Sequence, residues 1–299
     1  MAALAPQPIA GADEALLKSL RRDVDILARQ IGPRNPQHYA ALVQAAEFCQ
    51  RSFRGAGYAP RLQRYHVRDR EFANIIAEIE GNARRAEIVV VSAHYDTHKD
   101  TPGANDNASA VAALLHLARA LAGSAPARTM RFVAFTNEER PFTRTRRMGS
   151  RVYARECRER GEQIVGMIGL EMLGCYLPQK GAQWLSLGGL LLPREGDFLA
   201  VVGNRASRML LDQITGILRE TDALPIVPVV LPSHVPGAWS SDHWSFWREG
   251  FPAVMTTDTG PLRYRYYHRT DDTPDKLDFG WLAQVVAALE RVLRRLANL

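Results

Sequence analysis

Short apolar runs rich in β-branched residues alternate along this chain with stretches of helical periodicity, and this alternation limits the possible folds more than any other feature. The runs at residues 75–79, 88–91 and 130–135 are bounded by polar or turn residues, which is typical of buried strands. Between the last two, residues 108–121 repeat apolar side chains at helical spacing. The local order is therefore strand, helix, strand, which predicts an α/β fold.

The alternation continues to the end of the chain and predicts one doubly wound α/β domain over residues 1–299. Residues 1–57 contain two leading helices, which we expect to pack on this domain. The further predicted strands lie at 164–172, 198–202, 226–231 and 253–257, and the further helices start near 149 and occupy 207–220 and 277–296. In such a sheet, active sites gather beyond the carboxyl ends of the strands.

The composition is that of a globular protein. The length of 299 residues excludes a small disulfide-stabilised scaffold. Hydrophobic residues make up 46% of the positions, and the formal net charge is +6. Three cysteines without CxxC spacing predict reduced thiols. No apolar stretch reaches the roughly eighteen residues that span a bilayer, and the start lacks a basic segment ahead of a long apolar run. We therefore expect a cytoplasmic protein that does not bind a membrane.

The densest basic stretch holds eight arginines between Arg140 and Arg160. Stacking aromatic residues do not interleave with them as they would in a nucleic-acid groove, so we expect no nucleic-acid partner. Two interpretations remain open for this stretch. Its arginines form the solvated face of a helix and its leading loop, or they bind a carboxylate of a substrate.

Two motifs with potential metal ligands surround the first predicted strand–helix connection. His94 and Asp96 follow the very apolar run that ends at residue 91, and in an extended chain both project to the same side. One can then bind a metal ion while the other orients it, although a strand-end histidine bonded to an aspartate has the same pattern. Asp106 lies in a turn-rich loop that leads into a helix, where it either caps the helix or folds back toward His94.

Three more motifs follow later strands. Glu138 and Glu139 come directly after residues 130–135, and burying adjacent carboxylates without a cation is costly, so the pair is exposed or faces a metal ion. Glu171 interrupts an apolar strand, where lone acids seldom lack a partner. His268 follows the strand at 253–257, and by itself it is also compatible with an ordinary loop histidine.

Together the motifs supply two imidazoles and three carboxylates, from His94, Asp106, Glu139, Glu171 and His268. This set is sufficient for two zinc ions that share one carboxylate, with one of the two adjacent glutamates left to act as a general base. Nitrogen and oxygen ligands without thiolate suit catalytic rather than structural zinc, and manganese or cobalt can occupy the same set.

Six motifs occur in a fixed order: HYDT, PGANDNAS, NEE, LEMLG, SSDHWSFW and YHRTDDTPDKLD. With them the chain resembles, over residues of about 74–277, the co-catalytic di-zinc aminopeptidases of metallopeptidase clan MH, especially their bacterial, intracellular-type members. The resemblance implies a three-layer α/β/α fold with a twisted, mostly parallel mixed sheet of about eight strands, as in zinc aminopeptidases and phosphorylase-like hydrolases. It also implies a cis peptide bond after Asp106.

The resemblance assigns a role to each candidate residue. It implies one zinc ion held by His94 and Glu171, a second held by Glu139 and His268, and Asp106 bridging both. Outside the ligand set, it implies that Glu138 is the general base, that Asp96 orients His94, and that Tyr267 polarises the scissile carbonyl. The implied activity is hydrolysis of the N-terminal bond of a peptide or aminoacyl substrate.

The side-chain preference of such an enzyme stays open. After NEE this chain continues with residues 140–143, Arg-Pro-Phe-Thr, where its relatives tend to be apolar and aromatic. Five aromatic residues either line an apolar pocket or pack in the core: Trp239, Trp244, Phe246, Trp247 and Tyr264. Two other functions share the fold: a glutaminyl cyclase-like aminoacyltransferase, which typically works with one zinc ion, and a non-catalytic binding module.

Overall fold

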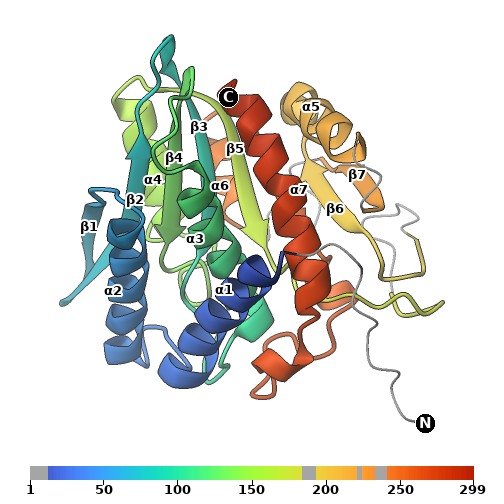
Figure 1. Cartoon of the computed structure of the whole chain (residues 1–299). Coiled ribbons are helices and arrows are strands. Elements are labelled where there is room, and N and C mark those ends of the chain that lie inside the picture. Colours follow the sequence, from blue (N-terminus) through green and yellow to red (C-terminus); the bar gives the residue numbers. More distant parts are fainter. Residues whose placement is uncertain (1–12, 184–192, 221–223, 233–240) are drawn as a thin grey trace.

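One mixed sheet of eight strands forms the middle of the molecule (Figure 1). The computed structural model describes residues 13–183, 193–220, 224–232 and 241–299. The strands are β1 (Arg61–Val67), β2 (Arg70–Ile79), β3 (Arg84–His94), β4 (Arg128–Phe135), β5 (Gln163–Glu171), β6 (Leu199–Gly203), β7 (Ile226–Val230) and β8 (Ala253–Thr257). Their spatial order is β1-β2-β4-β3-β5-β8-β6-β7.

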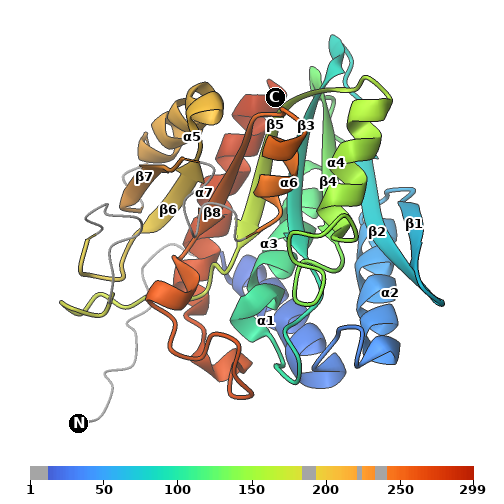
Figure 2. The same cartoon turned by 180° about the vertical axis from the view of Figure 1, so that it is seen from behind.

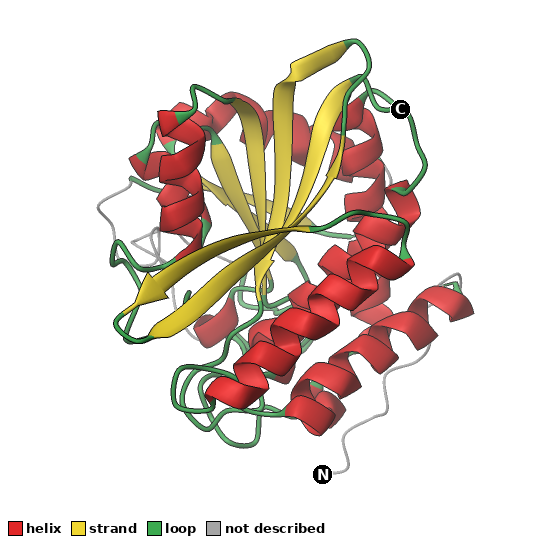
Figure 3. Cartoon of the chain, turned by 90° about the vertical axis from the view of Figure 1, so that its left-hand side faces the viewer, coloured by secondary structure: helices red, strands yellow, loops and turns green. Residues whose placement is uncertain are grey.

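The four central strands β4, β3, β5 and β8 run parallel to one another. β2 pairs antiparallel with β4 on one side and with β1 at the edge, whereas β6 pairs antiparallel with β8 and parallel with β7 on the other side. The carboxyl ends of the central strands therefore meet at one edge of the sheet, the lower edge in Figure 1. Figure 3 shows that the sheet is strongly twisted from one edge to the other.

Helices cover both faces of the sheet. In the view of Figure 1 the helices α1 (Glu14–Asp25), α2 (Tyr39–Gly55), α3 (Ala110–Leu121) and α7 (Phe279–Ala297) lie in front, and α5 (Arg208–Arg219) packs beside α7. From behind, Figure 2 shows α4 (Gly149–Glu159) and the short α6 (His243–Arg248). Short helical segments connect these elements at Ile26–Ile31, Ala104–Ser109, Arg205–Ser207, Gly260–Leu262 and Pro274–Lys276. These layers confirm the predicted three-layer α/β/α fold.

The apolar patterns explain why these segments form these elements. β3 is buried from Ile88 to its end, as expected for a central strand that is covered on both faces. α7 buries a continuous stripe that includes Trp281, Leu289 and Val292 against the front core. A separate cluster behind the sheet packs Tyr153 of α4 against the strands.

The structure adds one strand that the sequence did not indicate. β1 is mostly polar and only Gln63 and Val67 are buried, so its period-two signal is weak. Its backbone nevertheless pairs along its whole length with β2, which is sufficient to define an edge strand. The two leading helices contact α3 and β2, and the three cysteines are free and buried. In the described part of the chain, no helix combines the length and hydrophobicity that crossing a bilayer requires.

Candidate metal centre

Loops and strand ends bring the predicted site residues together at the carboxyl edge of the central strands. His94 ends β3, Asp106 lies in the helical turn Ala104–Ser109 ahead of α3, and Glu139 follows β4. Glu171 ends β5, and His268 lies in the loop after β8. Because parallel strands end at the same edge, residues that are far apart in the chain become neighbours.

The first group of side chains surrounds His94, whose imidazole is 1% exposed. Its Nε2 atom lies 3.4 Å from Asp106 Oδ1, 3.5 Å from Glu171 Oε2 and 3.9 Å from Glu138 Oε2. Ser241 donates a hydrogen bond of 2.6 Å to Glu171 Oε2 and thereby fixes that carboxylate. One atom each from His94, Asp106 and Glu171 lie within 4.8 Å of one another, which is close enough to hold one metal ion.

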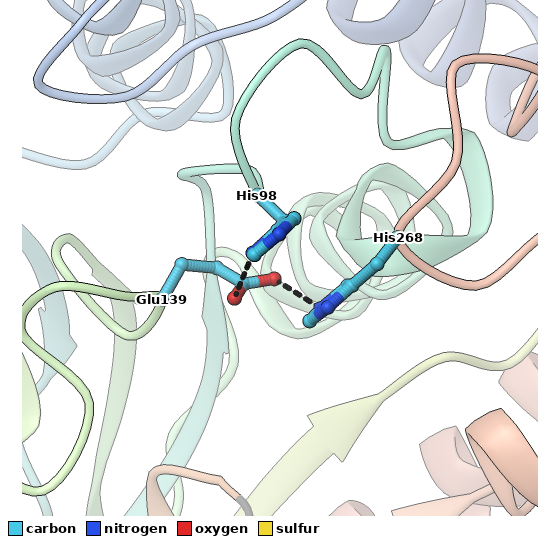
Figure 4. A group of neighbouring side chains, drawn as sticks. All are labelled: His98, Glu139 and His268. Atoms are coloured by element: carbon cyan, nitrogen blue, oxygen red, sulfur yellow. Dashed lines mark ion pairs between the residues drawn. The ribbon is translucent and has the colours of Figure 1, made fainter.

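The second group places Glu139 between two imidazoles (Figure 4). Glu139 Oε1 lies 2.9 Å from His268 Nε2, and its Oε2 lies 3.5 Å from His98 Nδ1. The rings of His98 and His268 are parallel, with their centroids 4.0 Å apart. Sequence reasoning missed His98, although its position four residues after His94 and ahead of the Asp106 loop was a signal for it.

Asp106 connects the two groups. Its Oδ1 faces His94 Nε2 at 3.4 Å, and its Oδ2 faces His268 Nε2 at 3.2 Å. Gly103, at a φ of +64°, allows the tight loop that turns Asp106 back, because a Cβ there would overlap the carbonyl oxygen of Asp106 and the Thr97 side chain. The peptide bond between Asp106 and Asn107 is cis, as the resemblance implied.

The chemistry of the site fits a cation. Within the two ligand groups, three buried imidazole nitrogens lack a hydrogen-bond partner among the described residues: His94 Nε2, His98 Nδ1 and His268 Nε2. All three face carboxylate oxygens, and buried polar atoms without partners are rare because they cost free energy. A divalent cation between the nitrogens and the carboxylates would satisfy both. The donors are nitrogen and oxygen, which match catalytic zinc.

The crowding of carboxylates is visible in the pKa values. Burial opposes protonation of His94, but the nearby carboxylates, chiefly those of Glu171 and Glu138, outweigh it and raise its pKa well above the usual value. At His268 burial is likewise outweighed, by the nearby carboxylates of Asp106 and Glu139, and the pKa rises to about 10. Such a concentration of negative charge attracts divalent cations as well as protons.

Asp96 fixes the backbone of the two adjacent glutamates. Its carboxylate oxygens accept hydrogen bonds of 3.1 Å from the backbone N–H groups of Glu138 and Glu139. Its Oδ1 also lies 3.5 Å from Nδ1 of His94, and that nitrogen contacts the backbone carbonyl of Asp96 at 3.2 Å. One buried carboxylate is thus placed to orient both the histidine and the glutamate pair.

Asp272 supports the loop that carries Asp106. Its carboxylate accepts hydrogen bonds from the backbone N–H of Asn105 at 2.9 Å and of Asp106 at 3.2 Å. The hydroxyl of Tyr264 donates to it at 2.6 Å. Asp272 therefore holds the Asp106 loop directly.

Glu138 and Tyr267 lie beside the two groups without completing either. Glu138 is buried, and burial together with repulsion from Glu139 raises its pKa well above the usual value, although His94 opposes this. Tyr267 stacks on His268 with ring centroids 3.8 Å apart. Burial raises the pKa of Tyr267, so its hydroxyl stays protonated and remains a donor.

Arg34 links the segment after α1 to the loops of the centre, and sequence reasoning missed it. The side chain is completely buried and donates to the carbonyl oxygens of Tyr95 at 2.7 Å, Pro102 at 2.6 Å and Gly103 at 3.0 Å. Two further bonds of 3.1 and 3.2 Å join it to carbonyls of residues 32 and 27. Burial lowers its pKa to about 10, against the opposing effect of nearby carboxylates.

Three of the five aromatic residues considered for an apolar pocket pack within the molecule. Phe246 is completely buried against Phe135 and Tyr153, and Tyr264 is buried beside Asp272. Trp247 packs between two core clusters and donates to the backbone carbonyl of residue 253. Trp244 lies under the guanidinium groups of two arginines, and Trp239 is outside the described residues.

Comparison with known proteins identifies a family. The model of peptidase family M28 matches residues 74–293. YfbL, an uncharacterised protein of Escherichia coli, is 34% identical over 279 residues, which are 90% of this chain and 85% of that protein. A probable leucine aminopeptidase of Trichophyton verrucosum is 28% identical over 220 residues, or 69% of this chain and 52% of that protein.

Solved structures share the fold. A zinc aminopeptidase from Bacillus subtilis superposes with a TM-score of 0.75 at 15% identity and covers 94% of this chain and 95% of its own. A glutaminyl cyclase from Fimbriiglobus ruber superposes with a TM-score of 0.70 at 21% identity and covers 98% of this chain and 99% of its own. At these identities the similarity concerns the arrangement of helices and strands.

Proposed function

Because the chain belongs to peptidase family M28, a family of co-catalytic zinc metallopeptidases, we propose that it is a zinc aminopeptidase that hydrolyses N-terminal peptide bonds. Membership in the family makes the chain a zinc peptidase. The amino-terminal specificity, the two-ion centre and the residue roles below are our proposal. We also propose that residues 1–299 act as one peptidase domain, with the two leading helices packed on it.

One observation carries the two-ion proposal. The carboxylate of Asp106 faces His94 with one oxygen and His268 with the other. It therefore lies between two ligand groups, each of which can hold a cation. We assign His94, Asp106 and Glu171, which lie within reach of one ion, to one zinc ion, and Asp106, Glu139 and His268 to the other. Manganese or cobalt would suit the same donors.

His98 adds a third side chain to the second group. Its ring lies parallel to that of His268, its Nδ1 faces the free oxygen of Glu139, and this nitrogen is buried without a hydrogen-bond partner among the described residues. An imidazole in this position either binds the second ion or orients the groups that do. We propose that His98 strengthens binding of the second ion.

Glu138 is the proposed general base. Its buried carboxylate faces the His94 group, but it belongs to neither ligand set, and Asp96 holds its backbone in place. When bound, zinc acts as a Lewis acid toward the scissile carbonyl and makes a coordinated water acidic. Glu138 would take a proton from the attacking water and pass it to the leaving amine.

Two further features complete the proposed mechanism. The hydroxyl of Tyr267, which stacks beside His268, would donate a hydrogen bond to the carbonyl oxygen as negative charge develops on it. The free amine of the substrate is a cation, so the carboxylate of Glu138 or Glu171 would hold it. A blocked amino terminus would lose this contact, which accounts for the proposed preference for free N-termini.

The test combines elemental mass spectrometry with peptide assays on the full chain. Two zinc, manganese or cobalt ions per chain, and release of free N-terminal residues from peptides, are the expected results. Release of ammonia from an N-terminal glutamine with ring closure, together with one ion per chain, would instead identify a glutaminyl cyclase. N-acetylated peptides serve as the control and should not be cleaved. A chain that binds no metal after reconstitution would contradict the proposal.

A further inference from the structure

A large basic cavity opens beside the second ligand group. It has a volume of about 820 Å³, and His98 and Arg140, the residue that follows Glu139, are part of its lining. A volume of this size accommodates a ligand of several residues. The cavity therefore adjoins the second ligand group.

Four separate segments form this cavity, and one of them is the pair of residues 98–99 after β3. The turn between β1 and β2 lies beyond the end of β4, because β2 pairs antiparallel with β4 and its first residues extend past Phe135. The loop after β4 forms a second side, and residues 35–37 after α1 form a third. Buried Phe72 and half-buried Phe142, which contact each other edge to face, supply an apolar part of the lining.

The charge of the lining is strongly one-sided. The lining contains one carboxylate, that of Asp69, and six cationic side chains, those of Arg68, Arg70, Lys99, Arg140, Arg146 and Arg147. All six cations are exposed. Among the described residues, none of the six is within ion-pair distance of a carboxylate; Arg70 instead reaches a backbone carbonyl and the ring of Tyr39.

The neighbouring arginines of the same basic stretch behave differently. On α4 and just after it, Arg155 pairs with Glu159 and Arg160 pairs with Glu156. These pairs are typical of a solvated helix face. The basic stretch therefore divides into a helical part, where Arg155 and Arg160 pair with glutamates, and a loop part, where Arg140, Arg146 and Arg147 line the cavity.

We propose that this cavity binds carboxylate groups on the part of the peptide that follows the scissile bond, so that the enzyme prefers short or acidic peptides. This inference rests on the proposed aminopeptidase function. An aminopeptidase places only one residue on the amino side of the scissile bond, and one side chain fills little of about 820 Å³. The larger leaving part of the peptide fits this volume, and guanidinium groups bind carboxylates strongly.

Three peptides with the same first residue distinguish the two sources of a carboxylate. Leu-Ala-Ala amide has none, Leu-Ala-Ala has a C-terminal carboxylate, and Leu-Asp-Ala amide has a side-chain carboxylate. We expect kcat/KM for at least one of the charged peptides to exceed that of the neutral amide by roughly tenfold, mainly through KM, and to fall as salt is added. Preference for the terminal carboxylate indicates short peptides, and preference for Asp indicates acidic ones.

Two double variants locate the effect. Replacing Arg146 and Arg147 with Gln should reduce the ratio between charged and neutral peptides toward one. Replacing Arg155 and Arg158 with Gln, on the exposed face of α4 and outside the cavity lining, is the matched control and should leave the ratio unchanged. Equal kcat/KM for all three peptides, or a ratio that survives the first substitution, would overturn the proposal.

A binding measurement separates this inference from the proposed function. N-acetylated Asp-Ala and N-acetylated Asn-Ala amide are not aminopeptidase substrates, so calorimetry reports their affinity without turnover. If no peptide is hydrolysed, the aminopeptidase proposal fails, but tighter binding of the acidic compound that depends on Arg146 and Arg147 would still support the cavity. Equal affinities would refute it independently of catalysis.

Discussion

Replacing Arg34 with Met tests how the site is held together. The guanidinium donates five hydrogen bonds, to the carbonyls of residues 27, 32, 95, 102 and 103, and the substitution removes all of them. At about 1 kcal/mol for each bond the loss is about 5 kcal/mol. Relief from burying a charge offsets part of this, so we expect a net destabilisation of about 3–4 kcal/mol.

Thermal unfolding measures this effect directly. For a chain of this size a loss of 3–4 kcal/mol lowers Tm by roughly 10 °C. The Tm of Arg34→Lys should fall between that of the parent and that of Arg34→Met, because an ammonium has at most three donors and lacks the planar fork of a guanidinium. Arg54→Met, on the exposed side of α2, is the control and should change stability by less than about 0.5 kcal/mol. A Tm for Arg34→Met within 2 °C of the parent would refute the reasoning.

Three further predictions concern the site and the thiols. Glu138→Gln should keep both ions but lower kcat by at least about a hundredfold, whereas activity close to that of the parent would contradict its role as base. His98→Ala should lower the affinity for one of the two zinc ions about tenfold or more in a chelator competition. The exposed His66→Ala is the control, and unchanged affinity for both ions would show that His98 is not part of the centre. Burial raises the pKa of Cys49 and Cys157 to about 12 and also raises that of Cys175, so thiolate is scarce at pH 8. A thiol reagent should therefore label these cysteines only after unfolding, and rapid labelling of the native protein would disprove this.

The sequence indicated the central strands and the ligand-type residues because both leave local patterns. β3 and β5 are short apolar runs, and the acidic or imidazole residues that follow them stand out against this background. Arg34 left no such signal, since its five partners are backbone carbonyls that have no residue identity. The basic cavity was equally hidden, because only the antiparallel register of β2 brings the turn after β1 to the loop that follows β4.

The distribution of the proposed ligands over five separate segments has a consequence for folding. His94, Asp106, Glu139, Glu171 and His268 come together only when the central strands are paired. An unfolded chain would have to close several long loops to reproduce either ligand group, which is entropically costly. Zinc would therefore bind the native state almost exclusively, and the protein's thermodynamic stability would rise with free zinc concentration. In a cell short of zinc, an inactive enzyme would also be a less stable one, more readily removed by proteolysis.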